Sequence, residues 1–314
     1  IGKTNYLNSL NLFSTVKLSY KNTDLIHIHW IGKELISLKA LNEIPRPIIW
    51  TMHDMWPILA TEHFINSTKN KEYLYDKDKY NFQKKIIINQ KKKLFKKQIH
   101  LVANSNWLKN YAKKSFLTKN LNVQCIYNPI KTSSWKRMNT FKSKKILKLN
   151  TNKKYLFFGA HGGFKNYRKG GDLFVDSLKK LQFLSKEYEV VVIGSDRNYI
   201  KYINNFKFHF RKATSNLKEQ LRYHSIADIT IVPSREESLP QFAVETLLCN
   251  NPVVGFNIGG MREIIQNKSN GFLAKPFSIN DLAKGIIFSI KHLNQKKIIK
   301  KRPEIVSKFD EKKV

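Results

Sequence analysis

The most constraining feature of this sequence is a short apolar segment that runs into a loop with two glutamates and then into a helix. Residues 227–232, Ala-Asp-Ile-Thr-Ile-Val, are typical of a buried strand, and residues 243–248 predict a helix whose first turn starts near Pro240. Glu237 would then lie beyond the carboxyl end of the strand, with Glu245 about two turns into the helix. Open α/β sheets bind ligands at such strand ends, and helix N-termini bind phosphate. A carboxylate beside phosphate needs hydroxyl partners, which indicates ribose and sugar hydroxyls.

Apolar segments alternate with helical patterns along the whole chain, which predicts an α/β protein with two doubly wound domains. Ser105 is expected to cap a helix, and another helix is expected around residues 34–41. The expected strands are residues 25–30, 48–52, 99–103, 123–127, 155–159, 189–194, 206–210, 228–232 and 253–256. The expected boundaries are an N-terminal domain at 1–130, a Lys- and Ser-rich linker at 131–153, a C-terminal domain at 154–295, and the start of a C-terminal helix at 296–314.

Hydropathy and cysteine content limit the class of protein. No run of about 18 apolar residues is present, which favours a soluble or peripheral protein. The two cysteines, Cys125 and Cys249, fall in apolar contexts without metal-ligand spacing around them. They are expected to be buried free thiols in a reducing compartment, which places the protein in the cytoplasm.

The formal net charge of +34 leaves three interpretations open. Dense positive charge attracts nucleic acid, but the basic residues are dispersed and no nucleic-acid-binding motif is present. Compositional bias toward Lys, Ile and Asn explains the charge more simply. A third interpretation is peripheral attachment to the anionic inner face of the cytoplasmic membrane, for which residues 83–97 are the best candidate. The competing interpretation of that segment is a surface helix whose apolar side packs on the core.

Several stretches together resemble retaining glycosyltransferases of family 4, the group 1 transferases with the GT-B fold. They are the Glu237 and Glu245 signature, residues 250–265 and 270–276, which resemble the strand, glycine turn and hairpin after it, and Tyr-Arg-Lys-Gly at 167–170. Residues 24–30 and 49–56 resemble a subgroup associated with bacterial surface polysaccharides, such as the colanic-acid and exopolysaccharide enzymes. The resemblance implies two Rossmann-like domains facing a cleft. It also implies an N-terminal domain that is incomplete at its start, because few residues precede the first expected strand.

The resemblance assigns roles in donor binding. Glu245 matches the glutamate that binds the ribose hydroxyls, and Glu237 matches the one near the transferred sugar, with Ser238 and Leu239 beside it. The alternative is that Glu237 is a surface carboxylate and Glu245 pairs with a nearby lysine.

The phosphate side of the donor is assigned in the same way. Lys169 matches the lysine that binds the diphosphate, and Arg168 is either a second contact or an exposed side chain. Ala160 stands where family members often have an arginine, and Gly162 and Gly163 could supply backbone amides instead. An ordinary flexible turn would explain the two glycines equally well.

On the other domain, His53 resembles the histidine that reaches toward the transferred sugar, although a histidine at a strand end is often structural. In the subgroup a Gly-Gly-Cys-His-Tyr stretch commonly follows, and this chain keeps only its histidine, His63. The identity of the acceptor therefore cannot be inferred from the subgroup.

The implied activity is transfer of a hexose from a UDP- or GDP-sugar to a glycan or lipid-linked acceptor in cell-surface polysaccharide synthesis, with His53, Lys169 and Glu237 as catalytic residues. The resemblance implies retention without a covalent intermediate. No metal or other cofactor is expected, because the resemblance is to the GT-B fold and not to the other main transferase fold, which typically has an Asp-x-Asp metal site. Two alternatives are another GT-B enzyme, such as a nucleotide-sugar epimerase or phosphorylase, and a noncatalytic basic binding protein.

Overall fold

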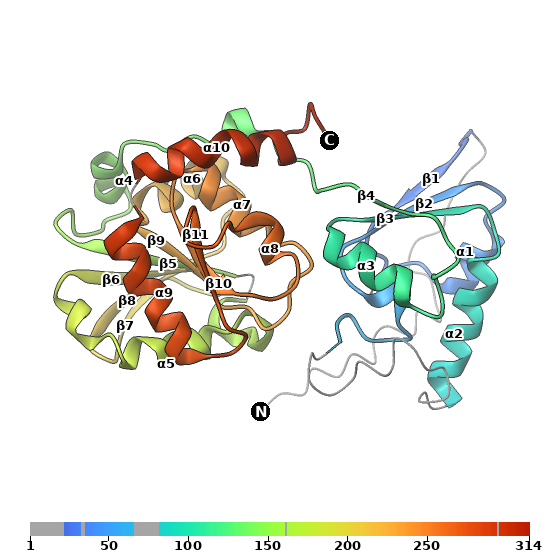
Figure 1. Ribbon diagram of the computed structural model, residues 1–314, viewed down its shortest axis with the longest axis horizontal. Coiled ribbons are helices and arrows are strands. Elements are labelled where there is room, and N and C mark those ends of the chain that lie inside the picture. The colour runs from blue at the N-terminus through green and yellow to red at the C-terminus, as the bar shows by residue number, and fades with distance from the viewer. Residues whose placement is uncertain (1–21, 33–34, 66–81, 161, 294) are drawn as a thin grey trace. The chain divides into compact units, whose positions relative to one another are not determined.

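The chain forms two compact units that divide between Tyr127 and Asn128. The computed structural model describes residues 22–32, 35–65, 82–160, 162–293 and 295–314. In Figure 1 the first unit runs from blue to teal and the second from green to red, and each has its own sheet with helices around it. The described helices include none that is both long enough and apolar enough to cross a membrane.

The first unit is built on a four-stranded parallel sheet in the order β1-β2-β3-β4. Its strands are β1 (Ile26–Ile28), β2 (Ile48–Met52), β3 (Ile99–Ala103) and β4 (Val123–Cys125). Its helices are α1 (Leu38–Glu43), the short 3-10 turn η2 (Trp56–Ile58), α2 (Phe82–Leu94) and α3 (Asn106–Lys114). The Ser105 side chain caps α3 by accepting a hydrogen bond from the Leu108 amide at 3.1 Å, as the sequence predicted.

Helix α2 covers most of the segment 83–97, for which the sequence left a membrane and a core interpretation open. Its apolar side packs inward, because Ile87, Ile88 and Leu94 are all buried in the core of the first unit. Phe82 remains 78% exposed at the start of the helix. The burial confirms the surface-helix interpretation for this segment.

The second unit is built on a seven-stranded sheet in the order β11-β10-β9-β5-β6-β8-β7, parallel except for β7. Its strands are β5 (Lys154–Gly159), β6 (Tyr188–Ser195), β7 (Tyr199–Ile203), β8 (Phe206–Lys212), β9 (Ile229–Val232), β10 (Val253–Phe256) and β11 (Gly271–Ala274). Its α-helices are α4 (Thr140–Ile146), α5 (Gly171–Lys179), α6 (Leu217–Ile226), α7 (Gln241–Leu248), α8 (Met261–Ile264), α9 (Ile279–His292) and α10 (Gln295–Phe309). Four 3-10 segments are η5 (Thr132–Ser134), η6 (Gly163–Lys165), η7 (Tyr167–Lys169) and η8 (Gln182–Lys186).

Side chains alternate across this sheet and form a core on each face, as the period of two in a strand requires. From β5, Leu156 and Phe158 point into a core shared with α5 and α9, while Tyr155 and Phe157 point into a second core shared with α6. Helices on both faces of a mostly parallel sheet make this a doubly wound α/β unit, as predicted.

Three predictions about this unit need correction. The Lys-rich stretch 131–153 was expected to be a linker, but it belongs to the second unit and contains α4. Asn139 caps α4, and the amine of Lys144 in that helix is satisfied by the carbonyls of Thr151 and Lys153, at 3.3 and 2.7 Å. The hairpin expected after Glu245 is instead the parallel pair of β10 and β11, with α8 between them. Finally, Glu245 lies about one turn into α7 rather than two, because α7 begins at Gln241.

Residues far apart in sequence meet where the chain enters the second unit. Ile130 forms a parallel bridge with Asp310, just after α10. The Ile130 amide donates to the Phe309 carbonyl at 2.8 Å, and the Glu311 amide donates to the Ile130 carbonyl at 3.0 Å. The guanidinium of Arg302 adds hydrogen bonds to the carbonyls of Thr132 and Leu248 at 3.1 Å each. Helix α10 is therefore held against the segment that opens the unit.

Candidate functional site

The second unit offers a ligand site where the order of its strands reverses. Strands β5 and β9 are neighbours, but the chain leaves β5 toward β6 and leaves β9 toward β10 on the opposite side. Open α/β sheets bind ligands at the carboxyl ends of neighbouring strands where the strand order reverses in this way. The loop after β5 holds η6 and η7, and the loop after β9 holds residues 233–240. All of the donor-binding residues predicted from the sequence follow one of these two strands.

Glu237 is the centre of this site. It is 6% exposed, and its carboxylate forms an ion pair with Lys169, accepts a hydrogen bond from the Ser234 hydroxyl at 2.8 Å and lies 3.5 Å from the Arg168 guanidinium. Burial opposes ionisation of this carboxyl, but Lys169 and then Arg168 outweigh it and hold the pKa of Glu237 below its usual value. The carboxylate is therefore ionised at neutral pH, and two cations from the other loop face it.

Glycines allow the loops to approach one another closely. At Gly259, which has a left-handed φ of +50°, a Cβ atom would lie 1.7 Å from the Glu237 carbonyl oxygen. A Cβ atom at Gly260 would lie 2.1 Å from the Ser238 carbonyl oxygen, and both Ser238 and Leu239 are buried. At Gly170, with φ +69°, a Cβ atom would lie 1.9 Å from the Pro233 carbonyl oxygen. Side chains at these positions would force apart the backbone that places Glu237 opposite Lys169.

The predicted glycine turn after β5 is a tight turn with both glycines in the left-handed region. Gly162 and Gly163 have φ angles of +80° and +53°, and the Gly163 amide donates to the Ala160 carbonyl at 2.9 Å. One of the two amides proposed for phosphate binding therefore already has an acceptor within the turn. His161, between Ala160 and Gly162, lies outside the described residues.

Glu245 projects from α7 and is backed by a histidine of α6. Its carboxylate lies 3.7 Å from the Nε2 atom of His224, which is 3% exposed. The other ring nitrogen of His224 lies 3.2 Å from the Thr246 hydroxyl oxygen, so the imidazole is held in place from the neighbouring helix. The glutamate is half-buried and is in contact with His224 rather than with a lysine.

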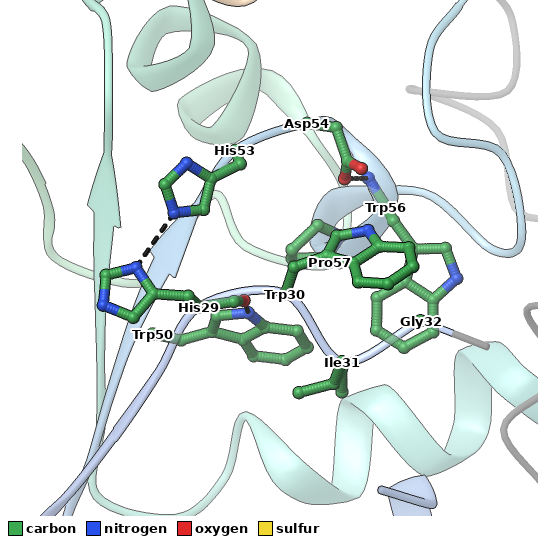
Figure 2. A pocket seen from close by; sticks show the side chains of 9 residues that line it. All are labelled: His29, Trp30, Ile31, Gly32, Trp50, His53, Asp54, Trp56 and Pro57. Atoms are coloured by element: carbon green, nitrogen blue, oxygen red, sulfur yellow. Dashed lines mark hydrogen bonds between the residues drawn. The ribbon is translucent and has the colours of Figure 1, made fainter. Parts of the chain in front are cut away.

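His53 belongs to a separate cluster in the first unit. Its Nε2 atom is hydrogen-bonded to Nδ1 of His29 at 2.9 Å, so the ends of β1 and β2 are joined there. Burial, and then the neighbouring His29, lower the pKa of His53. Figure 2 shows the two histidines on one side of a pocket and the rings of Trp30 and Trp56 on the other. The pocket therefore combines two imidazoles with aromatic faces.

The loop after β2 is organised by polar contacts within the first unit. The Asp54 carboxylate lies 2.6 Å from Nδ1 of His63 and accepts a hydrogen bond from the Trp56 amide at 2.9 Å. Beneath it, the amine of the fully buried Lys91 donates to the carbonyls of Trp56, Leu59 and Ala60, at 2.7 and 2.9 Å for the last two. The same amine lies 3.6 Å from the centre of the Trp56 ring. Burial lowers the pKa of Lys91 well below its usual value.

The structure brings Arg168, Lys169, Glu237, Ser238 and Leu239 together in the second unit. His53 lies in the first unit. Sequence reasoning missed Lys91, His29, His224, Arg235 and Asp172, whose contacts with the two clusters come from distant elements. The described residues include no group of three or more His, Cys, Asp or Glu side chains that could hold a metal ion. Cys249 is a buried thiol, as predicted, and burial raises its pKa to about 12, whereas Cys125 is half-buried rather than buried.

This chain is similar to a family of glycosyltransferases. The family described as glycosyl transferases group 1 matches residues 139–304, more than half of the chain. An uncharacterised glycosyltransferase of Methanocaldococcus jannaschii is 31% identical over 136 residues, which are 41% of this chain and 37% of that protein. The matched stretch thus spans well under half of that relative. An uncharacterised 41.2 kDa protein in the cps region of Klebsiella pneumoniae is 25% identical over 85% of this chain and 69% of its own length.

Solved structures agree on the fold. Sucrose-phosphate synthase from Thermosynechococcus elongatus superimposes with a TM-score of 0.68 at 15% identity, over 91% of this chain and 70% of that one. Anabaena HepE in complex with UDP gives a TM-score of 0.66 at 17% identity, over 91% of this chain and 75% of that one. These neighbours are GT-B glycosyltransferases, which confirms the predicted fold class.

Proposed function

The chain belongs to the glycosyl transferases group 1 family, and on that premise we propose that it is a retaining hexosyltransferase of family 4. The proposed reaction moves a hexose from a nucleoside-diphosphate sugar to a saccharide or lipid-linked saccharide acceptor. The observation that carries the proposal is the buried, ionised Glu237 between Lys169 and Arg168, where the loops after β5 and β9 meet.

Each part of the donor has a partner of suited chemistry in the second unit. A carboxylate accepts hydrogen bonds from vicinal hydroxyls, so Glu245 binds the ribose and Glu237 binds hydroxyls of the hexose. Lys169 and Arg168 bind the diphosphate, since cations form the strongest hydrogen bonds with phosphate oxygens. Ser238 and Leu239 line the site beside Glu237, and the turn at Gly162 and Gly163 supplies backbone close to the phosphates.

In the proposed mechanism the bond between the anomeric carbon and the β-phosphate oxygen breaks as the acceptor oxygen bonds to the same face of that carbon. The acceptor proton passes to an oxygen of the leaving diphosphate, so atoms and charge balance without a covalent intermediate. Lys169 stabilises the charge that develops on the diphosphate, and no metal ion is required. Glu237 and His53 position the hexose from the second and the first unit.

The proposed acceptor and pathway are supported by the names of two similar proteins. The Klebsiella pneumoniae relative comes from a cps region, and HepE has been solved with UDP and with UDP-glucose. These relatives favour a UDP-sugar as the donor and cell-surface polysaccharide synthesis as the setting. Work at the cytoplasmic face of the membrane, on a lipid-linked acceptor, is part of the same proposal.

Thermal unfolding of the purified chain with UDP, GDP or ADP tests the donor site. A ligand that binds only the folded state stabilises it by about 2.7 kcal/mol at a hundredfold excess over its Kd. We expect one nucleotide to raise the unfolding temperature, in buffer containing EDTA, and Glu245→Ala to abolish the shift. Glu187→Ala is the matched control, because Glu187 forms an exposed ion pair with Lys154 next to the amino end of β5.

The outcomes separate the candidate functions. Loss of the shift in Glu245→Ala but not in Glu187→Ala would support the donor site and identify the base. A folded chain that no nucleotide stabilises would contradict the proposal. Salt-sensitive binding of polyanions by such a chain would instead favour the noncatalytic alternative.

A further inference from the structure

Lys169 lies in a turn that has no apolar anchor of its own. The 3-10 turn η7 spans Tyr167–Lys169, and none of its residues is buried. The Tyr167 side chain is 68% exposed. Burial of apolar area therefore does not fix this turn, and its position depends on polar contacts with neighbouring segments.

Arg235, in the loop after β9, supplies those contacts. Its Nη1 atom donates to the Tyr167 carbonyl at 2.6 Å, and its guanidinium lies 3.7 Å from the centre of the Tyr167 ring. Its backbone amide donates to the Arg168 carbonyl at 2.8 Å. Both residues that precede Lys169 in the turn are therefore bound by this one arginine.

The same guanidinium also binds the segment that follows the turn. It forms a bidentate pair with the carboxylate of Asp172, in the first turn of α5, at 2.8 and 2.5 Å. These hydrogen bonds hold the pKa of Asp172 below its usual value. The Arg235 side chain is 16% exposed and that of Asp172 is 53% exposed. Arg235 thus connects the start of η7 with the helix that begins just after it.

We propose that Arg235 is a positioning residue that, with Asp172, holds η7 so that Lys169 and Arg168 face the diphosphate of the donor. This inference rests on the proposed function. The guanidinium acts through the turn, because its donors are directed to Tyr167 and Asp172. Arg235 therefore affects binding of the β-phosphate more than binding of the nucleoside, because the nucleoside is bound by Glu245 from a different element.

The ratio of the dissociation constants for UMP and UDP measures this selectivity. We would titrate the wild type, Arg235→Leu, Arg235→Lys and Asp172→Asn with both nucleotides by calorimetry, or with GMP and GDP if guanine nucleotides stabilise the wild type. We expect Arg235→Leu to weaken UDP binding about tenfold and UMP binding less than about twofold, the size of one charged hydrogen-bonding group. Arg235→Lys should give an intermediate ratio, since an amine cannot form the bidentate and stacked contacts.

Asp172→Asn tests whether Arg235 affects UDP binding through the turn η7, because Asp172 lies in a different element, α5. It should lower the ratio in the same direction as Arg235→Leu, because it loosens the same turn. If Arg235 contacted phosphate directly, Asp172→Asn would release its guanidinium and strengthen UDP binding, which would overturn the inference. Lys154→Met, which removes an exposed ion pair from the same unit, should leave the ratio unchanged.

Failure of this inference is distinguishable from failure of the proposed function. A wild type that prefers UDP over UMP, with an Arg235→Leu variant that keeps the full preference, would overturn the role of Arg235 alone. A wild type that binds neither nucleotide would overturn the proposed function, and this inference with it. Circular dichroism of each variant verifies that the chain remains folded when the ratios are compared.

Discussion

The two units hold their candidate functional residues by different means. In the second unit, Glu237 and Lys169 pair directly across two loops, and glycines bring the backbones of those loops together. In the first unit, the buried amine of Lys91 holds the loop that follows His53. It donates to three carbonyls of that loop and lies over one of its aromatic rings. The Glu237 site is thus fixed by a contact between the candidate functional residues themselves, whereas the loop after His53 is fixed by a fully buried residue outside the candidate set.

The largest expected effect comes from removing the buried amine of the first unit. Lys91→Met removes the amine that donates to three buried carbonyls, and we expect the free energy of unfolding of this unit to fall by about 3 kcal/mol or more. Urea unfolding followed by tryptophan fluorescence measures it, because Trp30, Trp50, Trp56 and Trp107 all lie in the first unit. The nucleotide-induced shift of the second unit should persist.

Lys93→Met is the matched control for Lys91→Met, because Lys93 lies on the same helix with its side chain exposed. It should change the unfolding free energy by less than about 0.5 kcal/mol. Equal effects of the two substitutions would show that Lys91 does not hold the loop, and the contrast between the units would fail.

A glycine substitution tests the second unit in the same way. Gly259→Ala places a Cβ atom 1.7 Å from the Glu237 carbonyl oxygen, so the loop must move. We expect a loss of about 2–3 kcal/mol in the stability of this unit, together with loss of nucleotide binding. Calorimetric unfolding with and without the nucleotide measures both quantities.

Gly162→Ala separates backbone strain from the clash at Gly259. Gly162 also has a positive φ, +80°, but the nearest atom to an added Cβ is the Asn166 Cβ at 3.6 Å. Only the left-handed strain remains, which costs about 1 kcal/mol. If Gly162→Ala were as damaging as Gly259→Ala, close packing against Glu237 would not be the cause.

The smallest expected effect is a pH dependence of the stability of the first unit. Because the pKa of His53 is lowered on folding, the folded unit binds fewer protons than the unfolded chain does. Its stability should therefore fall as the pH decreases below about 6.5, the usual histidine pKa, by less than about 1 kcal/mol. Urea unfolding from pH 7.5 to 5.5 measures the slope. His53→Gln should flatten it, and an unchanged slope would mean that another group is responsible.

Much of the fold was predictable because buried parallel strands consist of continuous runs of apolar residues. Strands β2, β3 and β10 have the predicted bounds, and the doubly wound architecture and fold class are confirmed. Prediction failed at α4, where a Lys-rich composition indicated a linker, because the amine of Lys144 finds carbonyl acceptors that only the folded chain provides. A Lys-rich composition indicates that burying the segment would cost free energy. Whether hydrogen bonds in the folded chain offset that cost is not visible in the composition.

Some residues of the candidate site were predictable from the sequence and others were not. Glu237, Glu245 and Lys169 were found because they occur in short contiguous motifs, and their roles in binding a donor stay predictions. Lys91 gave no signal, since it sits among other lysines of α2 and its carbonyl partners lie about 30 residues earlier in the chain. Arg235 lies inside the motif, yet its role depends on Asp172 and Tyr167, more than 60 residues away. Local pattern identifies groups that carry chemistry, but not the distant groups that orient them.

The pairing of Ile130 with Asp310 places the segment that enters the second unit beside the segment that follows α10. A polypeptide segment whose two ends lie side by side can be transplanted into a surface loop of another protein, or have its ends joined and be reopened elsewhere, without disturbing its sheet. The segment from Ile130 to Asp310 therefore has the end-to-end geometry of a module that could be combined with different partner domains while its own interior remains unchanged.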